Sequence, residues 1–517
     1  MLGIGAAVSV LAACSGAATP GAAYATRAWT ASPAATLRAG TGLRAGTALA
    51  AVTRAPAADS VLAQTAPAAL TAAFARTLFA SAPVVVVSGT TDTALRAAAA
   101  DAAAAHAPVL LAAAGTATAM TQLAGSVRAL HATDVLAQGL PTAWRGALAA
   151  RLPGVTVVSK PAALPATAAP APLARVAVLV SSSADPAAPA DAVAATARAA
   201  GASVIDVRGT DPRADPAAIT ALARLRPGEV VAVGARFGPA AQLASRVAVA
   251  ETGRQLPGGG QVMFPGRRLV ALYGHPGTPG LGVLGEQDLP ASIARARQMA
   301  APYRSLSGVP VVPAFEIIAS VAEASPGPDG TYSYETPVSQ LLPWVREATA
   351  DGLYVVLDLQ PGRASLLAQA EHYESLLALP DVGLALDAEW KLQPGQKPLR
   401  QIGHVDISEV NSVVDWLAAL TARHELPQKL LVLHQFQLAM IRGEQYLDTS
   451  HDDIAIVIHM DGQGTPGVKQ ATWNAVTAAA PRGVFFGWKN FLVKDHPMLT
   501  PGQTMRESPT PVMISYQ

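Results

Sequence analysis

Apolar runs and helical patterns alternate along the second half of the chain. Eight short apolar runs recur between residues 265 and 517, and most of them are separated by segments with apolar residues at three- and four-residue spacing. The runs are Leu269–Tyr273, Val309–Phe315, Leu353–Leu357, Val382–Leu386, Leu430–Leu433, Ile454–Ile458, Gly483–Phe486 and Val512–Ser515. Eight strand–helix repeats over this length predict a (β/α)8 barrel for 265–517. The helical pattern is missing from 489–511, so an open doubly wound sheet stays the alternative.

Smaller α/β units are predicted before the barrel. Val84–Val87, an alanine-rich helix reaching Ala105, and Val109–Leu111 form one strand–helix–strand unit, which requires parallel strands. The same order returns from Val176–Val180 onward. We therefore expect an α/β protein with one or two small parallel α/β repeat units, at 59–160 and 173–258. Residues 15–58, rich in Ala, Thr, Gly and Pro without apolar periodicity, predict a flexible tether.

Composition narrows the function classes. The 517 residues hold 37 basic and 36 acidic side chains, a net charge of +1, and only 14% of residues are charged. This balance offers no electrostatic basis for binding nucleic acid, which we exclude as a partner. No apolar run reaches the roughly 18 residues of a spanning helix. The single cysteine excludes an internal disulfide framework and a cysteine-based zinc cluster.

That cysteine, Cys14, follows Leu11-Ala12-Ala13 and an apolar segment that begins at Leu2. This stretch resembles a bacterial lipoprotein signal over residues 1–14. The resemblance implies cleavage before Cys14, lipidation of its thiol, and an extracytoplasmic protein held on the bacterial membrane by a lipid anchor. An ordinary apolar N-terminus with a buried cysteine is the alternative.

Ionisable and aromatic residues follow the predicted barrel strands. The C-terminal ends of barrel strands converge on one face, which carries the active site in such folds. Seven consecutive polar strand ends are hard to assign to packing, although a single Asp there often caps the next helix. The candidates for catalysis are the carboxyl groups of Glu316, Asp358, Asp387 and Glu389. The candidates for substrate binding are Tyr273, His275, Trp390, His434, His459, Asp461 and Trp488.

Strand spacing favours carbohydrate chemistry for these acids. Neighbouring strands lie about 4.8 Å apart, which brings Glu316 within ~5 Å of Asp358 and ~9–10 Å of Asp387. Glycosidases use two carboxyl groups at about 5–5.5 Å when they retain and about 6.5–9.5 Å when they invert the anomeric configuration. We take Glu316 and Asp387 as the first acid and base or nucleophile pair, with Asp358 and Glu389 as substitutes. A barrel that hydrolyses or recognises envelope carbohydrate is therefore predicted.

Two family resemblances agree with a location in the cell envelope. Gly89–Leu95 and Ala107–Leu111 are similar to the type-2 cell-wall-binding repeat, although Thr93 separates the expected Asp from Ala-Leu. This similarity implies that residues of roughly 60–240 bind cell-wall polymer. Val312–Glu316, Leu357–Gly362 and Leu384–Trp390 are similar to a set of actinobacterial lipoproteins with glycosidase-like barrels. The second similarity implies fold and location, and no catalytic role is transferred from it.

Two other functions remain possible, and dinucleotide binding is not expected. A non-catalytic envelope-binding protein and a metal-dependent barrel hydrolase remain alternatives. The metal ligands would come from His275, His434, His459, Asp358, Asp387 and Asp461. Gly280–Gly285 matches the dinucleotide fingerprint only as a string, because intervening residues separate it from the preceding strand and Pro290 delays the helix. A loop is expected there. We expect no cofactor and no metal.

Overall fold

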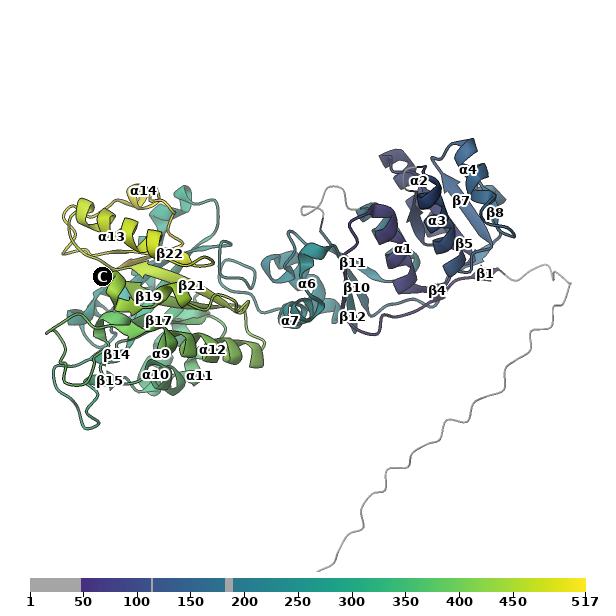
Figure 1. Ribbon diagram of the computed structural model, residues 1–517. Helices are drawn as coiled ribbons and strands as arrows, with labels where there is room; N and C mark the ends of the chain where they lie inside the picture. The colour runs from purple at the N-terminus through teal and green to yellow at the C-terminus, as the bar shows by residue number, and fades with distance from the viewer. Residues whose placement is uncertain (1–47, 113–114, 182–188) are drawn as a thin grey trace, which may run out of the picture. The chain divides into compact units, whose positions relative to one another are not determined.

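The computed structural model describes residues 48–112, 115–181 and 189–517 (Figure 1). The predicted signal with Cys14, and most of the predicted tether, lie outside these residues. Within the described part, none of the helices combines the length and the apolar character needed to cross a membrane.

Two four-stranded parallel sheets precede the barrel. The first has the strand order β6-β5-β7-β8 and the second β11-β10-β12-β3, with every pairing parallel. The strands are β5 (Val84–Ser88), β6 (Val109–Leu111), β7 (Asp134–Gln138), β8 (Thr156–Val158), β3 (Ser60–Leu62), β10 (Val176–Val180), β11 (Ser203–Asp206) and β12 (Glu229–Val233). The small parallel α/β units of the prediction are present. The second sheet also takes β3 from the start of the 59–160 range, which the sequence pattern did not indicate.

Helices connect these strands, as parallel pairing requires. They are α1 (Pro67–Leu78), α2 (Asp92–Ala105), α3 (Ala117–Ala129), α4 (Thr142–Ala149), α5 (Ala190–Ala199), α6 (Pro216–Leu225) and α7 (Ala240–Glu251). Their first turns follow ordinary capping rules: the Thr91 side chain accepts a hydrogen bond from Ala94 N at the start of α2, and Asp215 caps α6 ahead of Pro216. Short strand pairs, β1 (Leu49–Ala50) with β9 (Thr167–Ala168) and β2 (Val52–Thr53) with β4 (Phe79–Ser81), complete this region.

The C-terminal region is a closed barrel of eight parallel strands. The ring closes because β13 pairs with β14 on one side and with the last strand, β23, on the other. The strands are β13 (Arg268–Gly274), β14 (Val311–Ala322), β16 (Tyr354–Leu359), β17 (Val382–Asp387), β19 (Lys429–Gln435), β21 (Ile454–Met460), β22 (Phe485–Asn490) and β23 (Met513–Tyr516). Each corresponds to one of the eight predicted apolar runs, so the barrel prediction is confirmed and the open sheet is excluded.

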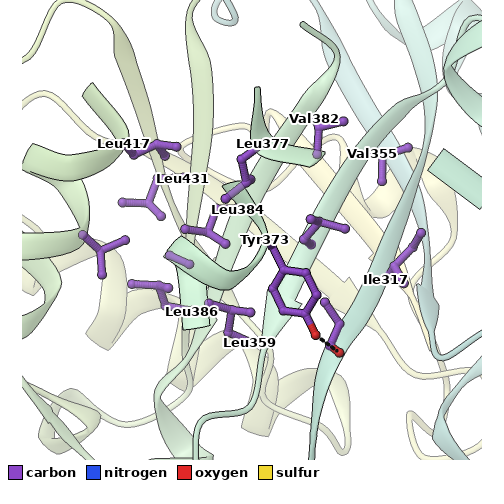
Figure 2. Close-up of a cluster of buried hydrophobic side chains, with 14 of the residues drawn as sticks. Ile317, Val355, Leu359, Tyr373, Leu377, Val382, Leu384, Leu386, Leu417 and Leu431 are labelled. Atoms are coloured by element: carbon purple, nitrogen blue, oxygen red, sulfur yellow. Dashed lines mark hydrogen bonds between the residues drawn. The ribbon is translucent and has the colours of Figure 1, made fainter. Parts of the chain in front are cut away.

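Helices follow most strands on the outside of the ring (Figure 1). They are α8 (Leu289–Ala300), α9 (Val338–Ala350), α10 (Leu366–His372), α11 (Glu374–Leu377), α12 (Ile407–Arg423), α13 (Pro466–Ala479) and α14 (Pro501–Thr504). The last connection contains only the single turn of α14, which explains the missing helical pattern there. Tyr373 separates α10 from α11, and its hydroxyl donates a hydrogen bond to Ala319 O at 2.7 Å (Figure 2).

The strands are buried on both faces. On the outer face, Leu384 and Leu386 of β17 pack with Leu377 and Leu417 from the covering helices (Figure 2). The alternate positions form a separate apolar cluster inside the ring. That cluster includes Leu269, Ala271, Val312, Ala314, Tyr354, Val356, Ala385, Leu430, Val432, Ala455, Val457 and Met513. Side chains therefore fill the barrel, and this packed interior supports whatever lies at its C-terminal end.

Candidate active site

A polar layer lies directly above the apolar interior. Successive side chains of a strand point to opposite faces, so the residue two positions beyond an inward-facing one also points inward. Each of the eight strands supplies one such polar residue next to the C-terminal face. In strand order they are Tyr273, Glu316, Asp358, Asp387, His434, His459, Lys489 and Ser515, all at most 3% exposed. The ring thus concentrates ionisable groups that lie far apart in the sequence.

His434 is the centre of this layer. Its Nε2 lies 2.9 Å from Glu316 Oε1, across the barrel, and its Nδ1 lies 3.2 Å from Asp461 Oδ2. Burial would lower the pKa of His434, but the two carboxylates raise that pKa well above its usual value. The same pairing overcomes the effect of burial on the acids and lowers the pKa of both Glu316 and Asp461. A buried imidazolium therefore lies between two ionised carboxylates.

The imidazole of His459 stacks against His434, with ring centroids 5.2 Å apart. Its Nε2 is 2.8 Å from Ser515 Oγ, and burial lowers the pKa of His459 to about 3, so this second ring is neutral. A side chain at Gly487 would begin 3.0 Å from the His459 ring. The glycine on the neighbouring strand leaves the space that this ring occupies.

Tyr273 joins another part of the layer. Its hydroxyl donates to Asp358 Oδ2 at 2.8 Å and accepts from Gln360 Nε2 at 3.3 Å. Burial raises the pKa of Asp358 to about 6, although His434 opposes this shift. Lys489 Nζ lies 3.4 Å from the centroid of the Tyr273 ring. This geometry is a cation–π contact in a desolvated position.

Three carboxyl groups meet at the mouth of the barrel. One oxygen each from Asp387, Glu389 and Asp461 lies within 4.8 Å of the others. Burial, together with the Asp461 carboxylate, raises the pKa of Glu389 to about 7. Burial and the neighbouring Glu389 raise the pKa of Asp387 well above its usual value. Two acids that hold their protons more tightly than usual therefore lie beside Asp461, whose pKa is lowered.

A cavity of about 350 Å³ opens onto this group. Its wall includes Glu389, Asp461 and Lys489 together with the rings of Tyr273, Trp390, Phe436 and Phe491. Glu316 and Asp387 do not line the cavity and are at most 2% exposed. The pair accessible to a ligand is therefore Glu389 with Asp461.

Most of the predicted site residues come together, but two lie elsewhere. Trp488 is fully buried on the outer side of β22, with its ring centroid 5.4 Å from that of Trp473 in α13. Its position follows from alternation, because its neighbour Lys489 points into the barrel. His275 is half-buried on the loop after β13, where Nε2 lies 3.1 Å from Thr336 Oγ1, and it is not part of the cavity wall.

The first predicted catalytic pair also has a different environment than expected. Glu316 is not at a strand end, because β14 continues to Ala322 and there pairs with the antiparallel β15 (Ser333–Glu335). It is ion-paired with His434 in the interior. Lys489 was missed as a site residue, because the local sequence does not show which of Trp488 and Lys489 points inward. Gln360 and Ser515 carried no chemical signal in the sequence.

The three carboxyl groups at the mouth offer the oxygen ligands that Mg²⁺ or Ca²⁺ prefers. Because the pKa values of Asp387 and Glu389 are raised, a cation would have to compete with protons for these oxygens. The histidine set of the metal hypothesis is not assembled, since His275 lies apart from His434 and His459 and the latter pair with Glu316, Asp461 and Ser515. The donor set thus suits acid–base chemistry better than a resident metal.

Comparison with known proteins adds no relative. No protein-family model, no curated protein and no solved structure matches the chain. The resemblances to cell-wall-binding repeats and to envelope lipoproteins remain predictions from the sequence. Functional assignment depends on the contacts within the barrel.

Proposed function

We propose that the barrel is a glycoside hydrolase, with Glu389 as the proton donor and Asp461 as the nucleophile. The observation that supports this proposal is the opposite direction of their pKa shifts at one cavity wall. The pKa of Glu389 is raised to about 7, while that of Asp461 is lowered. Two carboxyl groups held in different protonation states by their surroundings are what acid-assisted glycosidic cleavage requires.

The separation favours retention of anomeric configuration. One oxygen of each group lies within 4.8 Å of the other, a spacing that is shorter than the about 6.5–9.5 Å of inverting enzymes. In the first step an Asp461 oxygen attacks the anomeric carbon while Glu389 gives its proton to the departing glycosidic oxygen. In the second step the Glu389 carboxylate takes a proton from water, and the resulting hydroxide displaces Asp461. Glu389 is then protonated again, so the cycle is balanced.

The neighbours of the pair have supporting roles in this scheme. His434 keeps Asp461 ionised and is itself held by Glu316. The raised pKa of Asp387 favours its protonated form, which limits the negative charge beside the nucleophile. The rings of Trp390 and Phe436 supply flat apolar surface of the kind on which sugar rings stack.

The cellular location and the substrate class are further parts of the proposal. The segment around Cys14 supports export and lipidation, and the α/β units support binding to cell-wall polymer through their sequence similarity. We accordingly propose envelope polysaccharide as the substrate class and the outer face of the cell membrane as the location. Labelling with a fatty-acid analogue tests the anchor, since the wild type should incorporate it and Cys14→Ser should not.

The activity itself is tested by release of reducing sugar from purified bacterial envelope polysaccharide. Glu389→Gln should lower the rate by about 10²–10⁴-fold, because the proton donor is lost while the shape is kept. Asp415→Asn is the matched control, since that carboxylate has a side-chain exposure of 64% and lies outside the cavity. Equal rates in Glu389→Gln and in the wild type would exclude Glu389 as the acid.

The pH profile supplies a second prediction. Because the donor must be protonated in the free enzyme, kcat/KM should fall as the pH rises through about 7, the pKa of Glu389. The acidic limb should lie below the usual range for an aspartate, because the pKa of Asp461 is lowered. Initial rates measured across the range provide both limbs. A profile that stays flat through neutral pH would contradict the assignment of Glu389.

Two alternative functions can be distinguished with the same purified protein and polysaccharide. A non-catalytic binding protein should retain the polysaccharide in a pull-down while releasing no sugar. A metal-dependent hydrolase would use the three oxygen donors at the mouth, and it should lose activity with a chelator and contain stoichiometric metal. The acid–base proposal expects activity that survives the chelator.

A further inference from the structure

Lys489 has an unusual environment among the buried lysines. It is 3% exposed and lies at the wall of the active-site cavity, where its ammonium contacts the face of the Tyr273 ring. Within the described residues, no carboxylate oxygen lies within 4.0 Å of its Nζ and no hydrogen bond from Nζ is formed. Nearby carboxyl groups act on this ammonium only from beyond ion-pair distance, so a direct ion pair with a ligand would offset more of its desolvation cost.

The other buried lysines of the described chain are all satisfied. Lys391 pairs with Glu409 at 2.7 Å, and Lys469 pairs with Asp495 at 2.6 Å. Lys429 donates to backbone oxygens, including Val382 O at 2.7 Å. The lack of a partner at Lys489 is therefore specific to the lysine at the cavity, the position where a ligand can supply one.

A second donor at the same cavity also lacks an acceptor. The Nε1–H of Trp390, in the turn after β17, is buried without a hydrogen-bond partner. Both Trp390 and Lys489 line the cavity, and the exposed Lys494 lies at its wall as well. Glu316 and Asp461 are ionised nearby, but their direct contacts are with His434, and neither forms an ion pair with Lys489. The cavity wall therefore has an ammonium without a direct ion-pair partner and an indole N–H without an acceptor.

We propose that the barrel binds an acidic sugar, and that Lys489 forms an ion pair with the sugar carboxylate while Trp390 donates a second hydrogen bond. This inference is built on the proposed function and names its substrate class as polysaccharide with uronic-acid-type residues. A carboxylate satisfies both donors at once and returns an anion to the buried ammonium. A neutral sugar would leave Lys489 without a direct ion-pair partner.

The test compares one polymer in two chemical forms. The probes are a uronic-acid-rich bacterial envelope polysaccharide and the same polymer after its carboxyl groups have been reduced to primary alcohols. Affinity and rate of reducing-end release are measured for the full chain on both. The wild type should prefer the acidic form by roughly 10- to 100-fold, the usual effect of one charge-assisted contact.

Variants connect the preference to Lys489. In Lys489→Met the ratio between the two polymers should fall to about one, and in Lys489→Arg the charge should preserve part of the preference. The ratio is the readout because removing Lys489 also alters the pKa values of the neighbouring acids, which changes the rates on both polymers alike. Lys160→Met, an exposed lysine of the first α/β unit, is the charge-matched control and should keep the wild-type ratio.

The outcomes separate this inference from the proposed hydrolysis. Equal affinity and rate of the wild type on both polymers, or an unchanged ratio in a folded Lys489→Met, would overturn the role of Lys489. If Lys489→Met does not fold, a wild-type ratio that stays near one already overturns it. Preferential binding of the acidic polymer without sugar release, lost in Lys489→Met, would uphold the acidic ligand and reject hydrolysis. No binding of the acidic polymer would reject the inference.

Discussion

Asp461→Asn should reduce the release of reducing sugar by roughly 10³-fold or more, because an amide cannot form the glycosyl intermediate. The exchange keeps the size of a side chain that is 5% exposed, so the barrel should stay folded. Rates are measured on envelope polysaccharide, and Asp415→Asn again serves as the exposed control. The configuration of the product, followed by NMR immediately after cleavage, should match that of the substrate.

Two results would contradict this assignment. Inverted product would show that water, and not Asp461, attacks the anomeric carbon, even though the carboxyl groups lie within 4.8 Å of each other. Near-wild-type turnover in Asp461→Asn, together with a large loss in Asp387→Asn, would move the nucleophile to the deeper carboxylate. Either result can be told apart from misfolding by comparing the thermal unfolding of the variants.

The sequence predicts the ring of strands well and the orientation of individual side chains less well. Eight apolar runs are visible because barrel strands are buried on both faces and need apolar residues almost throughout. That same property hides which face is which: nothing local indicates that Lys489 points inward and Trp488 outward. The choice is fixed by register, where His459 is paired with Gly487 on the next strand.

Long-range contacts account for the rest of what the sequence could not predict. Glu316 looked like a strand end because it is polar, yet the residues after it, from Ile317 onward, continue the strand. Its partner His434 is 118 residues away and reaches it only across the closed ring. The pKa differences that distinguish Glu389 from Asp461 arise from that same closure, because His434 contacts one of the two acids and not the other.

His434→Phe should destabilise the barrel by about 3–5 kcal/mol near neutral pH, because it leaves two buried carboxylates without their common cation. For a barrel of this size we expect Tm to fall by roughly 10 °C. Thermal unfolding followed by circular dichroism measures the change. His451→Phe is the matched control: that histidine is 2.9 Å from Asp415, but both side chains are substantially exposed, so the loss should stay within about 1 kcal/mol.

The pH dependence of the difference identifies its electrostatic origin. In the wild type the pKa of Glu316 lies below 4.5, its unfolded value, so its stabilising effect is present above that value and is lost as the pH falls through the lowered pKa. The pKa of His434 lies above 6.5, so its contribution is complete below 6.5 and is lost only as the pH rises through the raised value. The destabilisation in His434→Phe should therefore be largest between the lowered pKa of Glu316 and the raised pKa of His434. It should shrink in acid, where the carboxyl groups that have lost their imidazolium partner take up protons. A loss of stability that is the same at all pH values would show that the imidazole acts by packing alone, and His434 would then have no part in keeping Asp461 ionised.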